Sequence, residues 1–212
     1  MPDLPTPFDP LADPQRLARA LLPLHGEPQG PGWNHAELAD LLDADTLAPA
    51  AVLVGLVPRP QGTHVLLTRR NDSLSTHAGQ VSFPGGRIDV EDRSAIEAAL
   101  RETWEEIALA PSIIEPLGFL DPYATITSFR VLPVVARIAP DYRASPNPAE
   151  VADAFEVPLA PLLAGEHLHS VETELYGRAR RYWEYRVGPH RIWGATAAML
   201  VNLARRLGAG IR

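Results

Sequence analysis

The stretch SFPGGRIDVEDRSAIEAALRETWEEIAL, residues 82–109, decides the fold of this chain. A glycine pair stands near its start, and three glutamates fall within five residues near its end. Ser94 with Glu97 three residues later forms a capping box, and the residues up to the last of these glutamates contain no glycine or proline. We therefore predict a glycine turn followed by a helix that starts at Ser94.

The carboxylates of this helix share one side of a helical wheel: Glu102, Glu105 and Glu106. The opposite side is apolar, and we expect Trp104 on that side to pack in the core. Like charges at these spacings repel each other. A hard divalent cation relieves the repulsion, because Mg²⁺ and Mn²⁺ prefer oxygen ligands. The alternative is a solvated acidic face.

Two neighbouring features favour a cation over a solvated face. Arg101 lies beside Glu105 on the wheel and can orient its carboxylate through paired N–H donors. The glycines at 85–86 allow the backbone to approach a ligand closely. The turn and the helix together predict a platform for a metal-bound phosphate.

Length and composition restrict the class of protein. The 212 residues are 46% hydrophobic, which is enough for one globular domain or for one domain with an extension. The net charge of −7 disfavours a general grip on nucleic acid phosphates. The chain has no cysteine and no apolar run of the ~18–20 residues that span a bilayer, and its first residues do not resemble a secretory signal. We expect a cytoplasmic protein without nucleic acid or membrane partners.

The order of helical and strand-like segments favours an α+β fold. Two short helices are expected in an N-terminal extension, residues 1–45, the first capped by Asp13 and the second by Asn34. Strands are expected at 48–60, 64–70, 80–86, 116–120, 131–138, 180–187 and 190–194. The first two make a hairpin, a helix-like segment is expected at 149–155, and a terminal helix at 195–207. Strands that are mostly not separated by helices argue against a doubly wound sheet.

Residues 86–109 resemble the signature of the Nudix hydrolases, G-x5-E-x7-R-E-U-x-E-E-x-G-U, in which U is a bulky aliphatic residue. The matching positions are Gly86, Arg101, Glu102, Glu105, Glu106 and Leu109. The chain departs from the signature at Asp92, where a glutamate is expected, at Thr103 and at Ala108. The gap that follows Asp92 is one residue longer than in the general pattern. None of these departures removes a metal ligand.

A second motif precedes the first. The segment LLTRRNDSLSTHAGQVSFPGG, residues 66–86, resembles the extra motif of the coenzyme A diphosphatase subgroup. The matching positions are Leu66, Leu67, Thr68, Arg70, Gly79, Phe83, Pro84, Gly85 and Gly86. Asn71 and Ser75 do not match, and the missing arginine at 75 weakens a substrate contact that the pattern implies. Two motifs in the correct order indicate this subgroup more strongly than either motif alone.

The resemblance implies a Nudix-type α/β/α sandwich with a mixed β-sheet over residues 46–212, with the signature loop and helix at 85–109. It implies a hydrolase that uses Mg²⁺ or Mn²⁺ to cleave the diphosphate bond of a small molecule, coenzyme A or a derivative, giving 3′,5′-ADP and 4′-phosphopantetheine. The implied catalytic residues are Arg101, Glu105 and Glu106. The implied metal ligands are Glu102, Glu105, Glu106 and the carbonyl of Gly85. The implied substrate-binding residues are Arg69, Arg70, His77 and Gly86, with Glu150 as an auxiliary base or ligand.

Several alternatives stay open. The same chemistry could act on ADP-ribose, a dinucleoside polyphosphate or an oxidised nucleoside triphosphate, or the chain could be a Nudix-fold binding module without turnover. His77 could be structural, Arg70 could form a surface ion pair, and Glu150 could be a carboxylate at a helix start. The preferred metal, the role of the first 45 residues and the oligomeric state, with a homodimer among the options, are also open.

Overall fold

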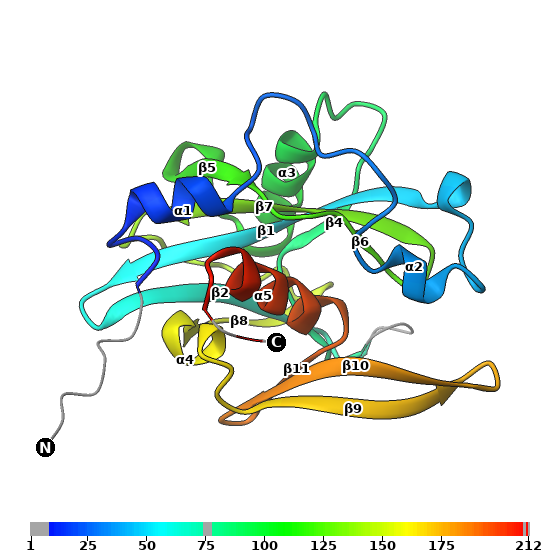
Figure 1. Ribbon diagram of the computed structural model, residues 1–212. Helices are drawn as coiled ribbons and strands as arrows, with labels where there is room; N and C mark the ends of the chain where they lie inside the picture. Colours follow the sequence, from blue (N-terminus) through cyan, green and yellow to red (C-terminus); the bar gives the residue numbers. More distant parts are fainter. Residues whose placement is uncertain (1–8, 74–77, 210, 212) are drawn as a thin grey trace, which may run out of the picture.

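The computed structural model describes residues 9–73, 78–209 and 211, and its centre is an eight-stranded sheet (Figure 1). The strands are β1 (Ala48–Arg59), β2 (Gly62–Arg70), β3 (Val81–Ser82), β4 (Gly85–Arg87), β5 (Ile114–Phe119), β6 (Tyr123–Ala124), β7 (Phe129–Ile138) and β8 (Val151–Pro158). β1 pairs in parallel with β7 and antiparallel with β2 and β4, so the sheet is mixed. The predicted first hairpin is present as β1 and β2.

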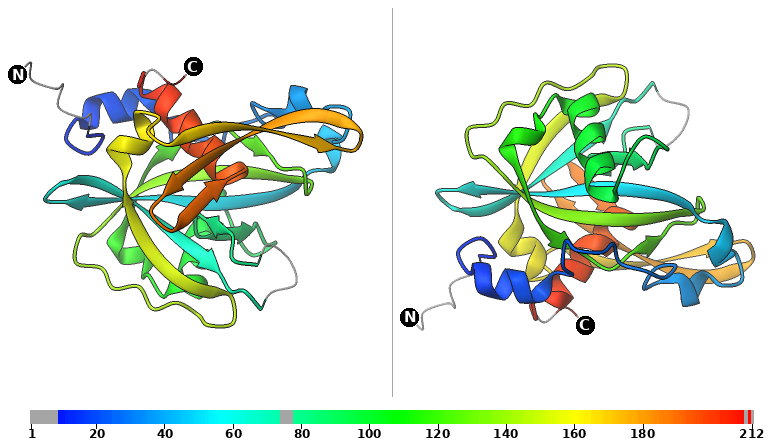
Figure 2. Two further views of the ribbon diagram at one scale, coloured as in Figure 1. Left: turned by 90° about the horizontal axis from the view of Figure 1, so that it is seen from below. Right: turned by 90° about the horizontal axis from the view of Figure 1, so that it is seen from above.

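Helices cover both faces of this sheet (Figure 2). One face carries α3 (Ala95–Ile107). The helices of the other face are α1 (Pro14–Ala20), α4 (Leu159–Leu163) and α5 (Ala195–Arg206). Successive residues of β1 serve the two faces alternately, because Leu53 packs with the α3 side and Val54 with the α5 side. The predicted α/β/α sandwich is confirmed.

A second, three-stranded antiparallel sheet lies beside α5 (Figure 1). Its strands are β9 (Leu168–Leu175), β10 (Arg178–Val187) and β11 (His190–Trp193). β10 and β11 are the two late strands that the sequence predicts. β9 is not predicted, and its residues are all exposed or only partly buried, so it lacks the alternating apolar pattern that marks a half-buried strand.

The prediction of a helix-like segment at 149–155 is wrong. β8 begins at Val151 and pairs with β2 along its whole length. The alanines of this segment favour a helix locally, but the second edge of β2 needs partners for its backbone N–H and C=O groups. Pairing with a distant strand therefore overrides the local preference.

The N-terminal segment packs against the same core as the sheet. Asp13 accepts a hydrogen bond from the first turn of α1, so the predicted cap is confirmed. Asn34 occupies the predicted N-cap position of α2 (His35–Leu38), but its side chain makes no capping hydrogen bond. The Asn34 amide instead bonds the backbone N–H and C=O of Ala124, each at 2.8 Å, which ties the segment to β6. Two short 3₁₀ helices complete the described elements: Ala44–Thr46 and Pro111–Ile113.

The core-facing side of α3 overlaps only in part with the predicted apolar side, because Ile107 of that side is buried but Trp104 is not. Ser94 caps the helix as expected, by accepting a hydrogen bond from the Glu97 N–H at 3.2 Å. The fully buried small side chains of the helix are Ala95, Ala98, Ala99 and Thr103. Trp104 is 52% exposed, so the prediction that it packs in the core is wrong. Small residues let α3 approach the sheet closely, and the carboxylate side of the helix turns toward the sheet with them.

Candidate active site

The glycine turn places backbone directly against α3. Gly85 and Gly86 belong to β4, opposite Val52 and Ala51 of β1. A Cβ atom on Gly86 would lie 2.5–2.7 Å from the carboxylate atoms of Glu102. Gly85 has a φ of 150°, and a Cβ there would lie 2.6 Å from the Cα of Val52. The Gly85 position therefore requires glycine, whereas at Gly86 a side chain would displace the Glu102 carboxylate, which lies against the backbone of the turn.

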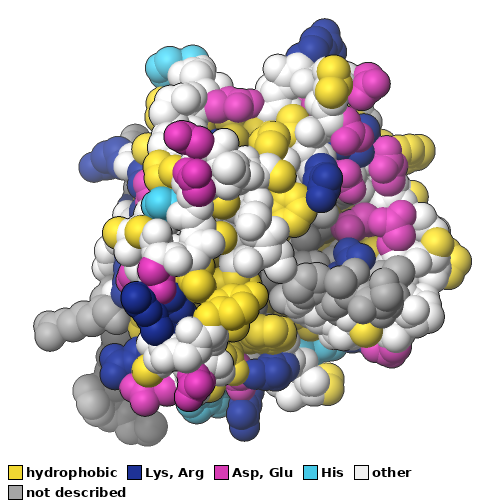
Figure 3. Space-filling view, turned by 90° about the vertical axis from the view of Figure 1, so that its right-hand side faces the viewer, with side chains coloured by type: hydrophobic (Ala, Val, Ile, Leu, Met, Phe, Trp, Pro, Cys, Tyr) yellow, Lys and Arg dark blue, Asp and Glu magenta, His cyan; other side chains and the backbone are white. Residues whose placement is uncertain are grey.

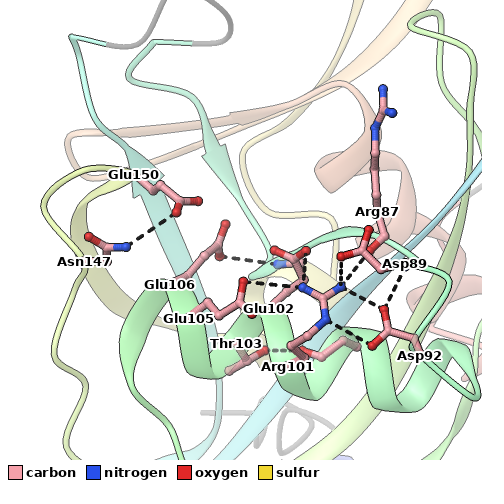
Figure 4. A network of polar contacts seen from close by, with 12 residues as sticks. Arg87, Asp89, Asp92, Arg101, Glu102, Thr103, Glu105, Glu106, Asn147 and Glu150 are labelled. Carbon is pink, nitrogen blue, oxygen red and sulfur yellow. Dashed lines mark hydrogen bonds and ion pairs between the residues drawn. The ribbon is translucent and has the colours of Figure 1, made fainter.

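Arg101 is the centre of a polar network (Figure 4). Its guanidinium donates to both carboxylate oxygens of Asp92, at 3.0 and 2.8 Å, and to the Arg87 carbonyl at 3.1 Å. It also donates to Glu102 at 2.9 Å, and the predicted contact with Glu105 is present at 3.4 Å. The hydrogen bonds from Arg101 lower the pKa of Asp92. The aspartate in place of the signature's glutamate, with its longer gap, thus still reaches the arginine.

Glu106 is the buried carboxylate of the group, with 4% of its surface exposed. The Gly85 N–H donates to it in a long contact of 3.4 Å. Burial, and next the charge of Glu102, raise the pKa of Glu106 from its usual value near 4.5 to about 8. Burial also raises the pKa of Glu102. Because burial and mutual repulsion disfavour the charged form of both carboxylates, a cation bound between them would be strongly favourable.

Glu150 reaches this group on a loop that is fixed at both ends. The Asn147 N–H donates to the Glu106 carbonyl, and the Asn71 N–H donates to the Glu150 carbonyl, each at 2.8 Å. The Glu150 side chain points toward Glu106 (Figure 4), and its charge contributes to the raised pKa values of Glu102 and Glu106. The interpretation of Glu150 as a carboxylate at a helix start is wrong, because a turn leads here into β8.

The three basic residues predicted to bind substrate upstream of the turn differ in their surroundings. Arg70 lies near Glu106 and its charge lowers the pKa of that carboxyl, while its buried Nε has no hydrogen-bond partner. In the described part of the chain Arg70 makes no salt bridge, which argues against the surface ion pair. Arg69 is instead bound to both oxygens of Asp72 at 2.9 Å. His77 lies outside the described residues.

The donor set suits a hard divalent cation. Its carboxylates belong to Glu102, Glu105 and Glu106, and the Gly85 carbonyl lies in the adjoining turn. Figure 3 shows several acidic side chains close together on the right of its view, with others on the left and at the bottom. Within residues 9–73 and 78–209, no three acidic or histidine side chains already stand together at metal-ligand spacing. Mg²⁺ ordinarily takes one or two carboxylates and completes its shell with water and substrate phosphate oxygens. The arrangement therefore suits a cation shared with a phosphate substrate.

A model of the Nudix domain matches residues 48–174, more than half of the chain. The chain belongs to the Nudix family. NudL of Escherichia coli (strain K12), named as an uncharacterized Nudix hydrolase, is 45% identical over 161 residues, which cover 75% of this chain and 82% of that protein. NudL of Klebsiella pneumoniae is 42% identical over 160 residues, covering 76% and 83%. Membership identifies this Nudix protein as a hydrolase of pyrophosphate bonds, and hydrolases of this family generally use divalent cations.

Solved structures resemble this Nudix chain more distantly. A NUDIX hydrolase from Alicyclobacillus acidocaldarius has a TM-score of 0.48 and 19% identity, covering 78% of this chain and 93% of that one. The NUDIX domain of Shewanella oneidensis NrtR, solved with ADP ribose, has a TM-score of 0.43 and 26% identity, covering 60% and 85%. Neither likeness identifies a substrate for this chain.

Two residues that contact the candidate site or its helix are missed by sequence reasoning. Glu27, in the N-terminal segment, accepts a hydrogen bond from the Ala95 N–H at the start of α3, at 2.6 Å. The two residues are 68 positions apart, so no local pattern could reveal the contact. Arg87, whose carbonyl binds Arg101, is also missed, although its position directly after the glycine pair is a usable signal.

Proposed function

We propose that this Nudix hydrolase cleaves the diphosphate bond of coenzyme A or a derivative, with Mg²⁺ or Mn²⁺, giving 3′,5′-ADP and 4′-phosphopantetheine. One water molecule is consumed: its oxygen joins one phosphorus while the bridging P–O bond to the other phosphorus breaks. The observation that carries the proposal is the unpartnered, buried Nε of Arg70 beside Glu106. This arginine belongs to the upstream motif that resembles the coenzyme A subgroup, and it lies where a diphosphate bound at the carboxylates needs a cation.

We assign roles to the carboxylates of α3, the Gly85 carbonyl and Arg101 from their positions. Glu102 and Glu106 are the principal metal ligands, with the Gly85 carbonyl as a further one. A cation held there neutralises phosphate charge and lowers the pKa of a bound water. Glu105 is a ligand or the base; its side chain is 51% exposed, so a proton that it accepts can leave to solvent. Arg101 holds the carboxylates of Glu102 and Glu105 in place from its anchor on Asp92.

Gly86, Arg70 and Glu150 complete the assignment. Gly86 presents backbone without a side chain, so that substrate phosphates can approach Glu102. Arg70 binds a phosphate oxygen through its guanidinium. Glu150 is an auxiliary ligand or base, supported by the fixed loop that points it toward Glu106. Arg69 is a weaker candidate because Asp72 already occupies its guanidinium.

A substrate panel tests the proposal. Purified protein is incubated with Mg²⁺ or Mn²⁺ and, in parallel, coenzyme A, dephospho-coenzyme A, ADP-ribose and an oxidised nucleoside triphosphate, with products identified by mass. We expect coenzyme A to be cleaved fastest, to 3′,5′-ADP, and the activity to be lost in Glu106→Gln. Faster cleavage of ADP-ribose or the oxidised nucleotide would reject the coenzyme A assignment but keep the hydrolase. No turnover of any substrate by folded, metal-loaded protein would favour a binding module.

The wider assignments also remain proposals. Among the described residues no helix is long and apolar enough to cross a bilayer. We propose a cytoplasmic enzyme with a Nudix domain at 46–212, an extension at 1–45, a small-molecule substrate and no nucleic acid partner. A homodimer stays a prediction that a measurement of mass in solution can decide.

A further inference from the structure

Arg87 faces away from the carboxylates although it follows the glycine turn directly. Side chains alternate along a strand, and the Gly86 position faces Glu102, so the Arg87 side chain leaves on the opposite face of β4. The strand register agrees, because Arg87 lies opposite Ala50, which packs with the α5 side of the core. In Figure 4 the Arg87 side chain extends away from the Arg101 network.

The Arg87 guanidinium lies over an aromatic ring. Its central carbon is 5.1 Å from the centre of the Phe129 ring, which belongs to the same face of the sheet. Such a contact holds a guanidinium in place without neutralising its charge. Within the described chain, Arg87 is exposed and makes no salt bridge with a carboxylate. Arg59 and Arg191 also lie over rings, but Glu156 and Glu184 neutralise them. Arg205 lies over Trp33 and Trp183 near the C-terminus of α5, away from the glycine turn.

Arg87 lies next in sequence to the residues that we propose bind the diphosphate. The Arg87 carbonyl accepts a hydrogen bond from Arg101. Arg87 also follows Gly86, whose backbone lies against Glu102, and consecutive Cα atoms are only about 3.8 Å apart. β4 therefore carries the contact with Glu102 on one face and a supported guanidinium on the other, one residue further along the strand. Guanidinium groups bind phosphates through paired N–H donors.

We infer that Arg87, supported by Phe129, binds a second phosphate of the substrate, separate from the diphosphate that is cleaved. This inference rests on the proposed function and deepens it: for coenzyme A, the second phosphate is the one on the 3′ carbon of the ribose. Arg87 is then a specificity-determining residue and Phe129 a positioning residue. Arg69, which Asp72 neutralises, is not needed for this contact.

The test compares two substrates that differ only in this phosphate. kcat/KM is measured for coenzyme A and dephospho-coenzyme A with the wild-type enzyme and with Arg87→Ala. We expect the preference for coenzyme A to fall by about tenfold or more in Arg87→Ala, because a charge-assisted hydrogen bond to phosphate is lost. Phe129→Leu should lose part of the preference, and Phe129→Tyr, which keeps a ring under the guanidinium, should retain it. Equal loss on both substrates would overturn the inference.

Arg137→Ala is the matched control for charge removal. Arg137 is an exposed arginine at the other end of β7, eight residues from Phe129 or about 26 Å along the strand. We expect it to leave the substrate preference unchanged, and a preference reduced as much as in Arg87→Ala would overturn the inference by showing a general charge effect.

A binding measurement separates this inference from the proposed function. If the wild-type enzyme cleaves neither substrate, the proposed function fails, and calorimetry with 3′,5′-ADP and AMP decides about Arg87. Tighter binding of 3′,5′-ADP that Arg87→Ala abolishes would support the phosphate subsite. Equal binding of the two nucleotides by the wild-type protein would overturn it.

Discussion

Gly86 shows how one missing side chain sets the position of a carboxylate that we propose as a metal ligand. Glu102 occupies the space that a Cβ on Gly86 would take, at 2.5–2.7 Å. Such a glycine can be predicted from the sequence, because paired glycines before a carboxylate-bearing helix indicate a close backbone approach. The contact partner could be predicted only from the strand register, which places Gly86 opposite Ala51 under α3.

Gly86→Ala should damage the site without unfolding the protein. The Cβ would press on the far end of a flexible side chain, so Glu102 moves and the fold is kept. We expect kcat/KM to fall by about 100-fold, as for other ~1 Å misplacements of catalytic groups, and the affinity for Mn²⁺ to weaken in calorimetry. Glu102→Gln is the comparison variant. Wild-type activity and Mn²⁺ affinity in Gly86→Ala would contradict the proposed role of this contact.

Glu106 should make the metal-free protein less stable as pH rises. Its pKa is about 8 in the folded protein and near 4.5 otherwise, so the folded state holds the proton more tightly and stability falls between these pH values. Glu106→Gln removes this dependence and should raise the free energy of unfolding at pH 8 by about 1–3 kcal/mol, while abolishing activity. Urea unfolding at pH 5 and pH 8 with a chelator measures it. An unchanged pH slope in the variant would show that Glu106 is not the group.

At the scale of elements, α3 illustrates what the wheel can and cannot predict. The wheel correctly groups Glu102 with Glu105 and Glu106, because the spacing of a helix fixes which residues are neighbours. It places Trp104 on the most apolar side of the helix, and an apolar side is expected to face the core. In the structure Ile107 of the apolar side is buried, but the core-facing side of the helix extends over its alanines, and Trp104 is left 52% exposed. Local patterns could not show which side faces the sheet.

The anchor between Asp92 and Arg101 should matter more than other charge pairs at the start of α3. Asp92→Asn removes the charge that holds the guanidinium by two hydrogen bonds. We expect metal affinity and kcat/KM to fall about 10–100-fold, as for other residues that orient metal ligands. Arg93→Ala is the matched control, because its pair with Glu97 is exposed and should leave both quantities near wild type. Equal effects of the two variants would contradict this role of the anchor.

At the scale of the whole molecule, hydrogen bonds and salt bridges join the N-terminal segment to the second sheet. Arg180 of β10 donates to both oxygens of Asp40 at 2.7 Å and also to the Glu37 carbonyl. Arg178 adds a salt bridge to Asp40 at 3.0 Å. Contacts of this kind join residues about 140 positions apart, so the sequence could predict the existence of these parts but not their mutual packing. The central sheet was more predictable, because its first hairpin and β7 carry strong apolar patterns.

Asp40→Asn should therefore loosen the second sheet. We expect amide hydrogen exchange in residues 178–181 to become several-fold faster, because both arginines lose their shared carboxylate. Glu172→Gln is the matched control, since its pair with Arg181 lies within the second sheet and is exposed on both sides. Exchange that is unchanged in Asp40→Asn, or equally faster in the control, would contradict a docking role for Asp40.

The position of a bound cation tests the central claim most directly. Crystals of the protein soaked with Mn²⁺ would be measured at a wavelength where manganese scatters anomalously. We expect an anomalous peak in contact with the carboxylates of Glu102 and Glu106 and next to the Gly85 carbonyl, and no peak there in Glu106→Gln. A peak confined to other acidic side chains, or one that persists at this place in the variant, would contradict the assignment of these carboxylates as the metal site.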